Sequence, residues 1–322
     1  MKSLLITGGA GFIGSNFIHY ILKKYPGYKI INYDALTYAG NLNNLRDIQG
    51  NSNYSFVKGH IADTQMVEKI FIKGIDYVIN FAAETHVDRS IIDSERFVVT
   101  NVLGVQTLLG LAKKYGVKKY VQISTDEVYG SLLHTGFFTE SNPLCPNNPY
   151  SASKASADLL TLAYYKTYKL PVNITRCSNN YGPNQYPEKL IPLIISKANS
   201  NKEVPIYGNG LNIRDWIHVE DHCRAIDLVL HNGKVGEVYN IGGNNEKTNL
   251  SIVKEILHIM KKDEGLIQYV TDRLGHDFRY AIDGTKIKEE LGFEPDTDFG
   301  TGLKSTVAWY IENADWFFKQ II

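Results

Sequence analysis

The sequence predicts an α/β protein with a Rossmann-like, doubly wound parallel sheet and a smaller, interleaved C-terminal region. Three observations support this prediction. Short apolar runs alternate with amphipathic stretches through about the first 175 residues, a glycine-rich turn follows the first apolar run, and the regular alternation is lost beyond Asn179. Strands that alternate with helices form parallel sheets covered by helices on both faces.

The first half of the sequence reads as strands and helices in turn. The apolar run Lys2–Thr7 predicts a strand, the amphipathic stretch Ile13–Tyr25 a helix and Tyr28–Tyr33 a second strand, which together make a β-α-β unit. The alternation continues with strands predicted at Ser55–Lys58, Tyr77–Phe81, Lys119–Ser124 and Val172–Arg176, and helices at Thr64–Ile72, Glu95–Tyr115 and Tyr150–Tyr168.

The second half differs in composition and in the length of its predicted helices. It is richer in Pro, Gly and Asn, and its predicted helices, Leu190–Asn199 and Ile252–Lys261, are shorter. The helical stretch Val219–Leu230 followed by the strand-like Val238–Ile241 predicts one more unit of the first sheet. We therefore expect a first domain at 1–178 plus about 215–243, and a second at about 179–214 and 244–322.

Composition excludes several classes of protein. The 34 basic residues balance the 34 acidic ones with no basic block, so we expect no nucleic-acid partner. No apolar run reaches the roughly 18 residues that span a bilayer, and Met1 leads at once into the first predicted strand, so we expect neither a membrane segment nor a signal peptide. Cys145, Cys177 and Cys223 are far apart, which indicates no disulfide framework and no metal site. A cytoplasmic protein is expected.

The pattern Gly8-x-x-Gly11-x-x-Gly14 lies between the first predicted strand and the first predicted helix. Glycines let the backbone approach a pyrophosphate, and the N-terminus of the helix supplies N–H donors. Asp34 stands twenty residues beyond Gly14, at the end of the second strand, where a carboxylate can accept hydrogen bonds from ribose hydroxyls. A dinucleotide site is predicted.

A second pair of residues points to a base. Tyr150-x-x-x-Lys154 places both side chains on one face of a helix, and Pro149 can set the start of that helix. Free tyrosine has a pKa near ~10, so a phenolate near neutrality needs a depression of about 3 to 4 units, on the order of 4 to 5 kcal/mol. Lys154, together with a positively charged oxidised nicotinamide, could supply it in a partly dry cleft.

The run Thr125-Asp126-Glu127 follows the strand predicted at Lys119–Ser124. The two carboxyl groups offer a proton donor and a second base beside the tyrosine, more than a simple alcohol dehydrogenase needs. Separate roles require environments that push the two pKa values apart, with Asp126 protonated and Glu127 ionised. The alternative is that both residues only cap the segment that follows. The pattern favours redox chemistry combined with elimination.

These motifs resemble the extended short-chain dehydrogenase/reductase family, and Thr125-Asp126-Glu127 resembles its dTDP-glucose 4,6-dehydratase branch. The resemblance spans the length of the chain. It implies NAD-dependent oxidation of a nucleotide sugar at C4, elimination of water across C5–C6 and reduction at C6. The product is a 4-keto-6-deoxy sugar of the kind used for dTDP-rhamnose, and NAD is regenerated in each turnover. Supporting stretches are Ala82–Ser90, Cys177–Pro183, Pro187–Pro192, Pro205–Tyr207, Arg214–Trp216, Asn245–Asn249 and Arg273–Asp277.

The resemblance also implies a role for each side chain. Tyr150 takes the proton of the C4 hydroxyl, with Thr125 hydrogen-bonded to that oxygen. Glu127 then removes the C5 proton while Asp126 protonates the departing C6 hydroxyl. The implied catalytic residues are thus Thr125, Asp126, Glu127, Tyr150 and Lys154.

The implied binding residues form two sets, one for NAD and one for the nucleotide sugar, in a C-terminal substrate-binding region. The NAD set is Gly8, Gly11, Phe12, Ile13, Gly14, Asp34, Leu36, Thr37, His60, Ile61, Phe81, Ala82, Ala83, Thr100, Tyr150, Lys154 and Asn180. The substrate set is Thr85, Thr125, Asn179, Lys189, Leu190, Pro205, Ile206, Tyr207, Arg214, Asn249, Arg273 and His276. His60 departs from the family, which usually has an aspartate there, so the adenine contact falls to the backbone of Ile61.

Other functions stay open on the sequence. Another nucleotide-sugar enzyme of the same family is possible: a UDP-sugar 4,6-dehydratase, a 4-epimerase, which needs no acid–base pair after Thr125, or a decarboxylase, which usually has serine at Asp126. A dinucleotide-sensing regulator would keep the fold without the chemistry. By fold analogy, a homodimer would pack through the helices at Glu95–Tyr115 and Tyr150–Tyr168.

The sequence also predicts the choice of cofactor. No arginine or lysine directly follows Asp34, so nothing there neutralises the 2′-phosphate of NADP. We expect the purified protein to bind NAD more tightly than NADP in a direct titration of both. Tighter binding of NADP would refute the assignment of Asp34.

Overall fold

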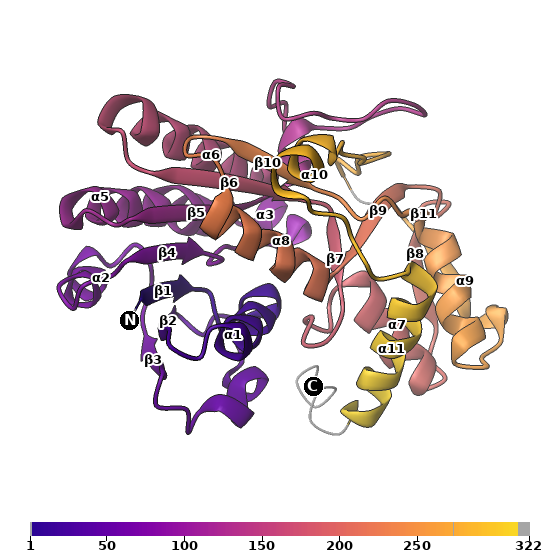
Figure 1. The fold of residues 1–322 in the computed structure, drawn as a ribbon. Helices are drawn as coiled ribbons and strands as arrows, with labels where there is room; N and C mark the ends of the chain where they lie inside the picture. Colours follow the sequence, from indigo (N-terminus) through magenta and orange to yellow (C-terminus); the bar gives the residue numbers. More distant parts are fainter. Residues whose placement is uncertain (1, 273, 315–322) are drawn as a thin grey trace.

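The computed structural model describes residues 2–272 and 274–314, and its main feature is a seven-stranded sheet (Figure 1). The strand order is β10-β6-β5-β4-β1-β2-β3, and every neighbouring pair runs parallel. The Rossmann-like prediction is confirmed, including the return of β10 to the edge of this sheet. The strands are β1 (Ser3–Thr7), β2 (Lys29–Asp34), β3 (Tyr54–Lys58), β4 (Tyr77–Asn80), β5 (Lys119–Thr125), β6 (Val172–Cys177) and β10 (Val238–Ile241).

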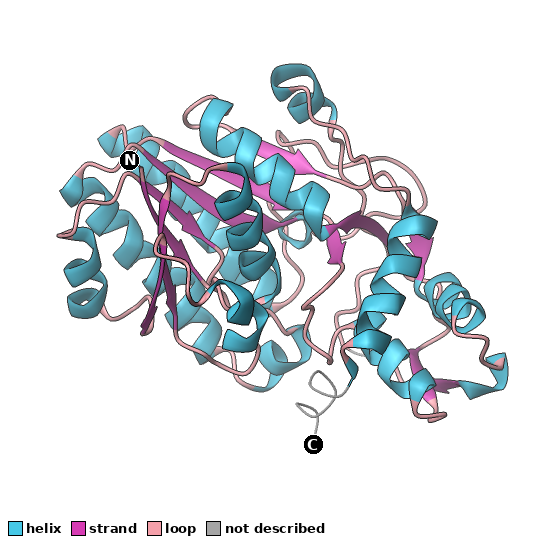
Figure 2. Ribbon diagram, turned by 60° about the horizontal axis from the view of Figure 1, so that its bottom comes forward, coloured by secondary structure: helices cyan, strands magenta, loops and turns pink. Residues whose placement is uncertain are grey.

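Helices cover both faces of this sheet (Figures 1 and 2). On one face, α1 (Phe12–Lys24) and α8 (Val219–Asn232) pack against Leu4 and Ile6 of β1. On the other, Leu5 belongs to the core formed with α2 (Thr64–Phe71), α5 (Val105–Tyr115) and α6 (Pro149–Tyr168). Successive strand residues point to opposite faces, so a strand covered on both sides must be apolar at nearly every position.

Hydrogen bonds among buried polar side chains fix the register of the central strands. The Thr7 hydroxyl of β1 donates to Asn80 Oδ1 of β4 (2.5 Å), and Asn80 Nδ2 donates to Gln122 Oε1 of β5 (2.9 Å). The Tyr120 hydroxyl donates to the same Gln122 oxygen (2.8 Å). A buried polar group without a partner is costly, so a slipped register that broke this polar ladder would be destabilising.

The C-terminal region has its own strands and its own core. One sheet joins β11 (Glu246–Thr248), β9 (Ile213–His218) and β7 (Asn179–Tyr181), and a second pairs β12 (Ile267–Val270) with β8 (Val204–Tyr207). The core contains Ile194, Trp216, Ile256 and Leu303. Its helices are α7 (Leu190–Asn199), α9 (Asn249–Ile259) and α11 (Phe299–Glu312).

Some elements differ from the sequence predictions. The predicted helix Glu95–Tyr115 is divided into α4 (Glu95–Phe97), a π-helical segment η2 (Val98–Gly104) and α5. At Gly104 a side chain would collide with Ile61, so this helix approaches the neighbouring loop more closely than a larger residue would allow. Like α11 and the C-terminal strands β7, β8, β9, β11 and β12, five further elements had no prediction: η1 (Leu42–Ile48), α3 (Val87–Ile92), η3 (Asp126–Tyr129), η4 (Glu264–Leu266) and α10 (Thr285–Leu291).

The start of α6 is fixed by a capping box. Asn148 Oδ1 accepts from Ser151 N (2.9 Å), the Ser151 hydroxyl accepts from Asn148 N (3.4 Å), and Pro149 occupies the first turn. This arrangement satisfies backbone donors that would otherwise lack partners and fixes the direction in which Tyr150 enters the helix. Within the described ranges, no helix is long and apolar enough to cross a bilayer.

Candidate active site

A cleft of about 300 Å³ opens at the carboxyl ends of β1, β2, β4, β5 and β6. Parallel strands end at one edge of their sheet, and ligands of open α/β sheets bind there. The glycine-rich turn and the Thr125-Asp126-Glu127 run therefore face the same cavity, although more than one hundred residues separate them.

The glycine-rich turn packs closely against neighbouring backbone, and the N-terminus of α1 follows it. Gly8 has a left-handed conformation (φ 69°), and a side chain there would lie 2.5 Å from Ala82 N. At Gly14 a side chain would collide with the carbonyl of Gly8. The first turn of α1 contains no acidic residue, and no side chain caps its N-terminus, so its N–H groups are available to an anion. This cradle fits a dinucleotide pyrophosphate.

Asp34 is held by the backbone around it. Its Oδ2 accepts from Ala10 N (2.9 Å) and its Oδ1 accepts from Leu36 N (2.8 Å). Burial raises the pKa of this carboxyl, and the two backbone hydrogen bonds oppose the rise. The carboxylate is thereby oriented at the mouth of the cleft. Leu36 itself does not line the cavity; its backbone, at φ 53°, turns the loop around Asp34.

His60 takes part in a local hydrogen-bond network. Its Nε2 contacts Thr100 Oγ1 (3.1 Å), and its Nδ1 accepts from Ala62 N (3.1 Å). His60, Ile61 and Thr100 all line the cleft, and Thr100 belongs to the π-helical segment η2. The imidazole thus links the loop after β3 to that segment.

Tyr150 and Lys154 enter the cleft from α6, and both are buried. Lys154 Nζ donates to the carbonyl of Ile123 (2.6 Å), which holds the ammonium under the end of β5. The expectation that the two side chains share one helix face toward the cleft is confirmed by the cavity lining.

Asp126 and Glu127 do not cap the segment that follows them. The cap of η3 is Thr125, whose hydroxyl accepts from Glu127 N (3.3 Å) and donates to Asp126 Oδ1 (3.3 Å). Asp126 Oδ2 is buried and has no hydrogen-bond partner among the described protein atoms. A buried oxygen without a partner that lines a cleft is available to a ligand.

Burial dominates the electrostatics of this cluster. It raises the pKa of Asp126 well above the ordinary aspartate range, and the neighbouring Glu127 carboxyl adds to the rise. It also raises the pKa of Tyr150, again with a contribution from Glu127, and lowers the pKa of Lys154. Burial thus favours the protonated forms of Asp126 and Tyr150 and the neutral form of Lys154, so that Tyr150 would need additional positive charge to lose its proton.

The structure distributes the predicted binding residues between two places. Every residue of the NAD set except Leu36 lines the cleft, as do Thr85, Thr125, Asn179 and Lys189 of the substrate set. Lys189 Nζ donates to the carbonyl of Thr85 (3.1 Å) across the cleft. The remaining described members of the substrate set lie in the C-terminal region outside the cavity lining: Leu190, Pro205, Ile206, Tyr207, Arg214, Asn249 and His276.

Arg214 and His276, which lie outside the cavity lining, contact other groups of the protein. Arg214 is buried and donates to the carbonyls of Ile213 (2.7 Å) and Asp277 (2.9 Å). His276 Nδ1 lies 2.6 Å from Asp272 Oδ1. The predicted Arg273 lies outside the described residues.

Sequence reasoning missed twelve residues that line the cleft. Most adjoin a predicted residue at the end of a strand, so the rule that ligands bind at carboxyl ends could have found Ser124 and Cys177. No local pattern marks Gln185 or Tyr186, which a loop of the C-terminal region brings to the cavity. Among the residues that the structure describes, no cluster of His, Cys, Asp or Glu could hold a metal. The twelve are Tyr33, Ala35, Ala39, Gly40, Gly59, Glu84, Ile123, Ser124, Cys177, Ser178, Gln185 and Tyr186.

The raised pKa of Asp126 predicts a pH-dependent stability. Between the ordinary aspartate pKa of 3.8 and the raised value, the folded state binds more protons than the unfolded state, so stability falls as pH rises. Each pKa unit corresponds to about 1.4 kcal/mol. We expect Asp126→Asn to gain thermal stability over wild type as pH rises from about 5 to 8. The matched control Asp93→Asn, at an exposed ion pair with Arg96, should show no such trend. A stability difference independent of pH would contradict the raised pKa.

Comparisons with known proteins agree with this geometry. The family model described as GDP-mannose 4,6 dehydratase matches residues 5–306. A dTDP-glucose 4,6-dehydratase of Xanthomonas campestris pv. campestris (strain B100) is 49% identical, over 98% of this chain and 95% of that protein.

Two solved structures are similar over nearly the whole chain. The crystal structure of dTDP-glucose 4,6-dehydratase from Bacillus anthracis str. Ames in complex with NAD is 57% identical, with a TM-score of 0.94, and covers 99% of this chain and 100% of that one. DesIV, a dTDP-glucose 4,6-dehydratase from Streptomyces venezuelae with NAD and TYD bound, is 48% identical, with a TM-score of 0.97 and the same coverage. This chain therefore belongs to the dTDP-glucose 4,6-dehydratase branch of the extended short-chain dehydrogenase/reductase family, as Thr125-Asp126-Glu127 predicts.

Proposed function

We propose that this protein is an NAD-dependent hydro-lyase that converts dTDP-glucose to dTDP-4-keto-6-deoxyglucose, the type of intermediate used for dTDP-rhamnose and other deoxysugars. One observation carries the proposal: a buried aspartate whose pKa is raised by burial, a second carboxyl and a Tyr–Lys pair line the same cleft as a dinucleotide cradle. Relatives of the same branch, about half identical over almost the full length, support the substrate.

NAD fits the cradle formed by the glycine-rich turn, Asp34 and the residues around His60. When bound, it supplies an acceptor for hydride from C4 and a donor of hydride to C6. We expect it to stay tightly bound, because the reaction consumes no net reductant.

The side chains divide the proton transfers between them. Tyr150 accepts the proton of the C4 hydroxyl, with Thr125 hydrogen-bonded to that oxygen. Lys154 stabilises the phenolate. The positive charge of the oxidised nicotinamide, bound in the cradle, offsets the effect of burial, which raises the pKa of Tyr150. Glu127 removes the C5 proton, which the new C4 ketone acidifies, and C5 is reprotonated when hydride is added at C6. Asp126, kept protonated by burial, donates to the departing C6 hydroxyl.

We also propose a division of labour between the two regions. The seven-stranded sheet and its helices, 1–178 and about 215–243, would bind NAD, and 179–214 with 244–322 would bind the nucleotide diphosphate and base. The separate sheets and the separate core of the C-terminal region support this division. Arg214, Arg273 and His276 would supply positive charge or donors to the diphosphate. Leu190, Pro205, Ile206, Tyr207 and Asn249 would frame the nucleoside.

A direct assay tests the proposal. The wild-type protein should convert dTDP-glucose to a 4-keto-6-deoxy product, which absorbs strongly in alkali, and should act more slowly on UDP-glucose. The double variant Asp126→Asn, Glu127→Gln should still reduce bound NAD at C4 but release at least roughly tenfold less product, because acid–base catalysis typically contributes about 10²- to 10⁴-fold. Unimpaired turnover by the double variant would refute the roles of both carboxyls, and formation of a C4 epimer would indicate an epimerase.

The same geometry supports a homodimer in the cytoplasm. Large apolar side chains are exposed on η2 and α6, including Leu103 (49%) and Leu159 (59%), and a pair of helix faces of this kind would be covered in a dimer. The three cysteines, Cys145, Cys177 and Cys223, are free, which suits a reducing compartment.

Substitution tests the dimer. Introducing charge with Leu103→Glu and Leu159→Glu should convert a dimer to a monomer in light scattering. The control Leu133→Glu, at a leucine that is even more exposed (76%) on the loop between η3 and α6, should leave the mass unchanged. A monomeric wild-type protein would contradict the proposal.

A further inference from the structure

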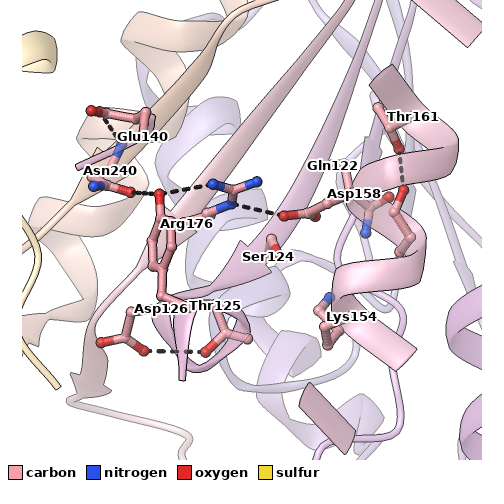
Figure 3. Close-up of polar contacts among 12 residues, drawn as sticks. Gln122, Ser124, Thr125, Asp126, Glu140, Lys154, Asp158, Thr161, Arg176 and Asn240 are labelled. Atoms are coloured by element: carbon pink, nitrogen blue, oxygen red, sulfur yellow. Dashed lines mark hydrogen bonds and ion pairs between the residues drawn. The ribbon is translucent and has the colours of Figure 1, made fainter. Parts of the chain in front are cut away.

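A buried arginine lies behind the cleft and holds two of the elements that bring catalytic groups into it (Figure 3). Arg176, near the end of β6, donates through Nε to Asp158 Oδ2 on α6 (2.8 Å) and through Nη1 to the Tyr129 hydroxyl at the end of η3 (2.8 Å). The exposed fractions of Arg176, Asp158 and Tyr129 are 3%, 0% and 2%. None of the three lines the cleft, so none is a candidate to contact substrate.

At one end of this network, Asp158 anchors α6, the helix that carries Tyr150 and Lys154. Asp158 is one helical turn beyond Lys154 and two turns beyond Tyr150, so its ion pair with Arg176 anchors the part of α6 that brings both residues to the cleft. Figure 3 shows Lys154 and Asp158 on this helix, facing the end of the sheet.

At the other end, Tyr129 anchors η3, the turn that carries Asp126 and Glu127. Asp126 and Glu127 are the first residues of η3, and Tyr129 is its last. Thr125 caps the beginning of this turn, whereas Arg176 binds its end. The four-residue turn is therefore fixed at both ends by side chains.

Both the hydroxyl and the ring of Tyr129 contact neighbouring side chains. Its hydroxyl accepts from Arg176 and donates to Asn240 Oδ1 on β10 (2.8 Å). Asn240 is itself fixed, since its backbone N donates to Glu140 Oε1 (2.8 Å) and its Nδ2 donates to the carbonyl of Phe138 (2.9 Å). The Tyr129 ring stacks on Phe138 at 5.1 Å and lies 4.7 Å from the Arg176 guanidinium.

We propose that Arg176 and Tyr129 are positioning residues for the elimination step, which set the place of the Asp126-Glu127 turn relative to Tyr150. A guanidinium suits this task because its planar fork can donate in two fixed directions at once. This inference rests on the proposed dehydratase function. It assigns no contact with substrate to either residue.

The test is Tyr129→Phe, studied as the NAD-loaded protein with dTDP-glucose. The substitution removes one oxygen and leaves Arg176 paired with Asp158, so α6 keeps its anchor. We expect the first reduction of NAD to stay within about twofold of wild type, whereas elimination slows by roughly tenfold or more, because small misplacements of catalytic groups are costly. Reduced cofactor should then accumulate during turnover, visible in its absorbance.

Tyr239→Phe is the matched control. Tyr239 is also fully buried, lies next to Asn240 on β10, and its hydroxyl accepts from Lys234 N (3.0 Å) and donates to Glu290 Oε2 (2.8 Å). It does not line the cleft. We expect a comparable loss of thermal stability, with the ratio of reduction to elimination unchanged.

Arg176→Lys provides a second route if Tyr129→Phe does not fold. Lysine keeps a positive charge for Asp158 but lacks the fork that reaches Tyr129, so the same accumulation of reduced cofactor is expected. The two substitutions combined should slow elimination no more than either alone, because they remove one shared contact.

Several results would overturn the inference. Equal slowing of both steps in Tyr129→Phe and Arg176→Lys, or accumulation of reduced cofactor in Tyr239→Phe as well, would leave the network a purely structural role. A wild-type protein that never reduces NAD with dTDP-glucose would overturn the proposed function and this inference together, whereas normal wild-type turnover with unaltered step ratios in the variants overturns this inference alone.

Discussion

The parallel register of β1, β4 and β5 is the constraint on which the active site depends. The buried ladder of Thr7, Asn80 and Gln122 fixes that register from within the sheet. Because these strands run the same way, their carboxyl ends meet at one edge, and the glycine-rich turn after β1 faces the acid–base turn after β5. A slip of one residue would separate the hydrogen-bonded side chains of the ladder and leave buried polar groups without partners.

Burial then sets the chemistry at that edge. The same burial that raises the pKa of Asp126 also disfavours the charged forms of Tyr150 and Lys154. One environment thus favours a protonated carboxyl at Asp126 and a neutral phenol at Tyr150. In the proposed mechanism, the first suits proton donation, and the second makes the base depend on positive charge brought by the cofactor.

The hydrogen-bond network around Arg176 connects the elements that lie behind the cleft. It links α6, η3 and β10 through hydrogen bonds among buried groups, which are costly to leave unpaired. Asp126 is only three residues from the Arg176 contact at Tyr129, and Lys154 is one turn from the contact at Asp158. The side chains on the cleft side therefore rest on a polar network whose members do not line the cleft.

Sequence patterns predict the doubly wound sheet, the cradle and the Tyr–Lys helix, because each depends on local periodicity or on a short motif with fixed spacing. The sequence also indicates that Asp126 and Glu127 lie near that helix, because they directly follow the strand predicted at Lys119–Ser124 and Tyr150-x-x-x-Lys154 follows about 25 residues later. The tertiary structure alone decided the short strands β7, β9 and β11, whose pairs are distant in the chain and whose residues carry little pattern. It also decided the cleft positions of Gln185 and Tyr186 and the partners of Arg176, because contacts between remote segments leave no periodicity in the sequence.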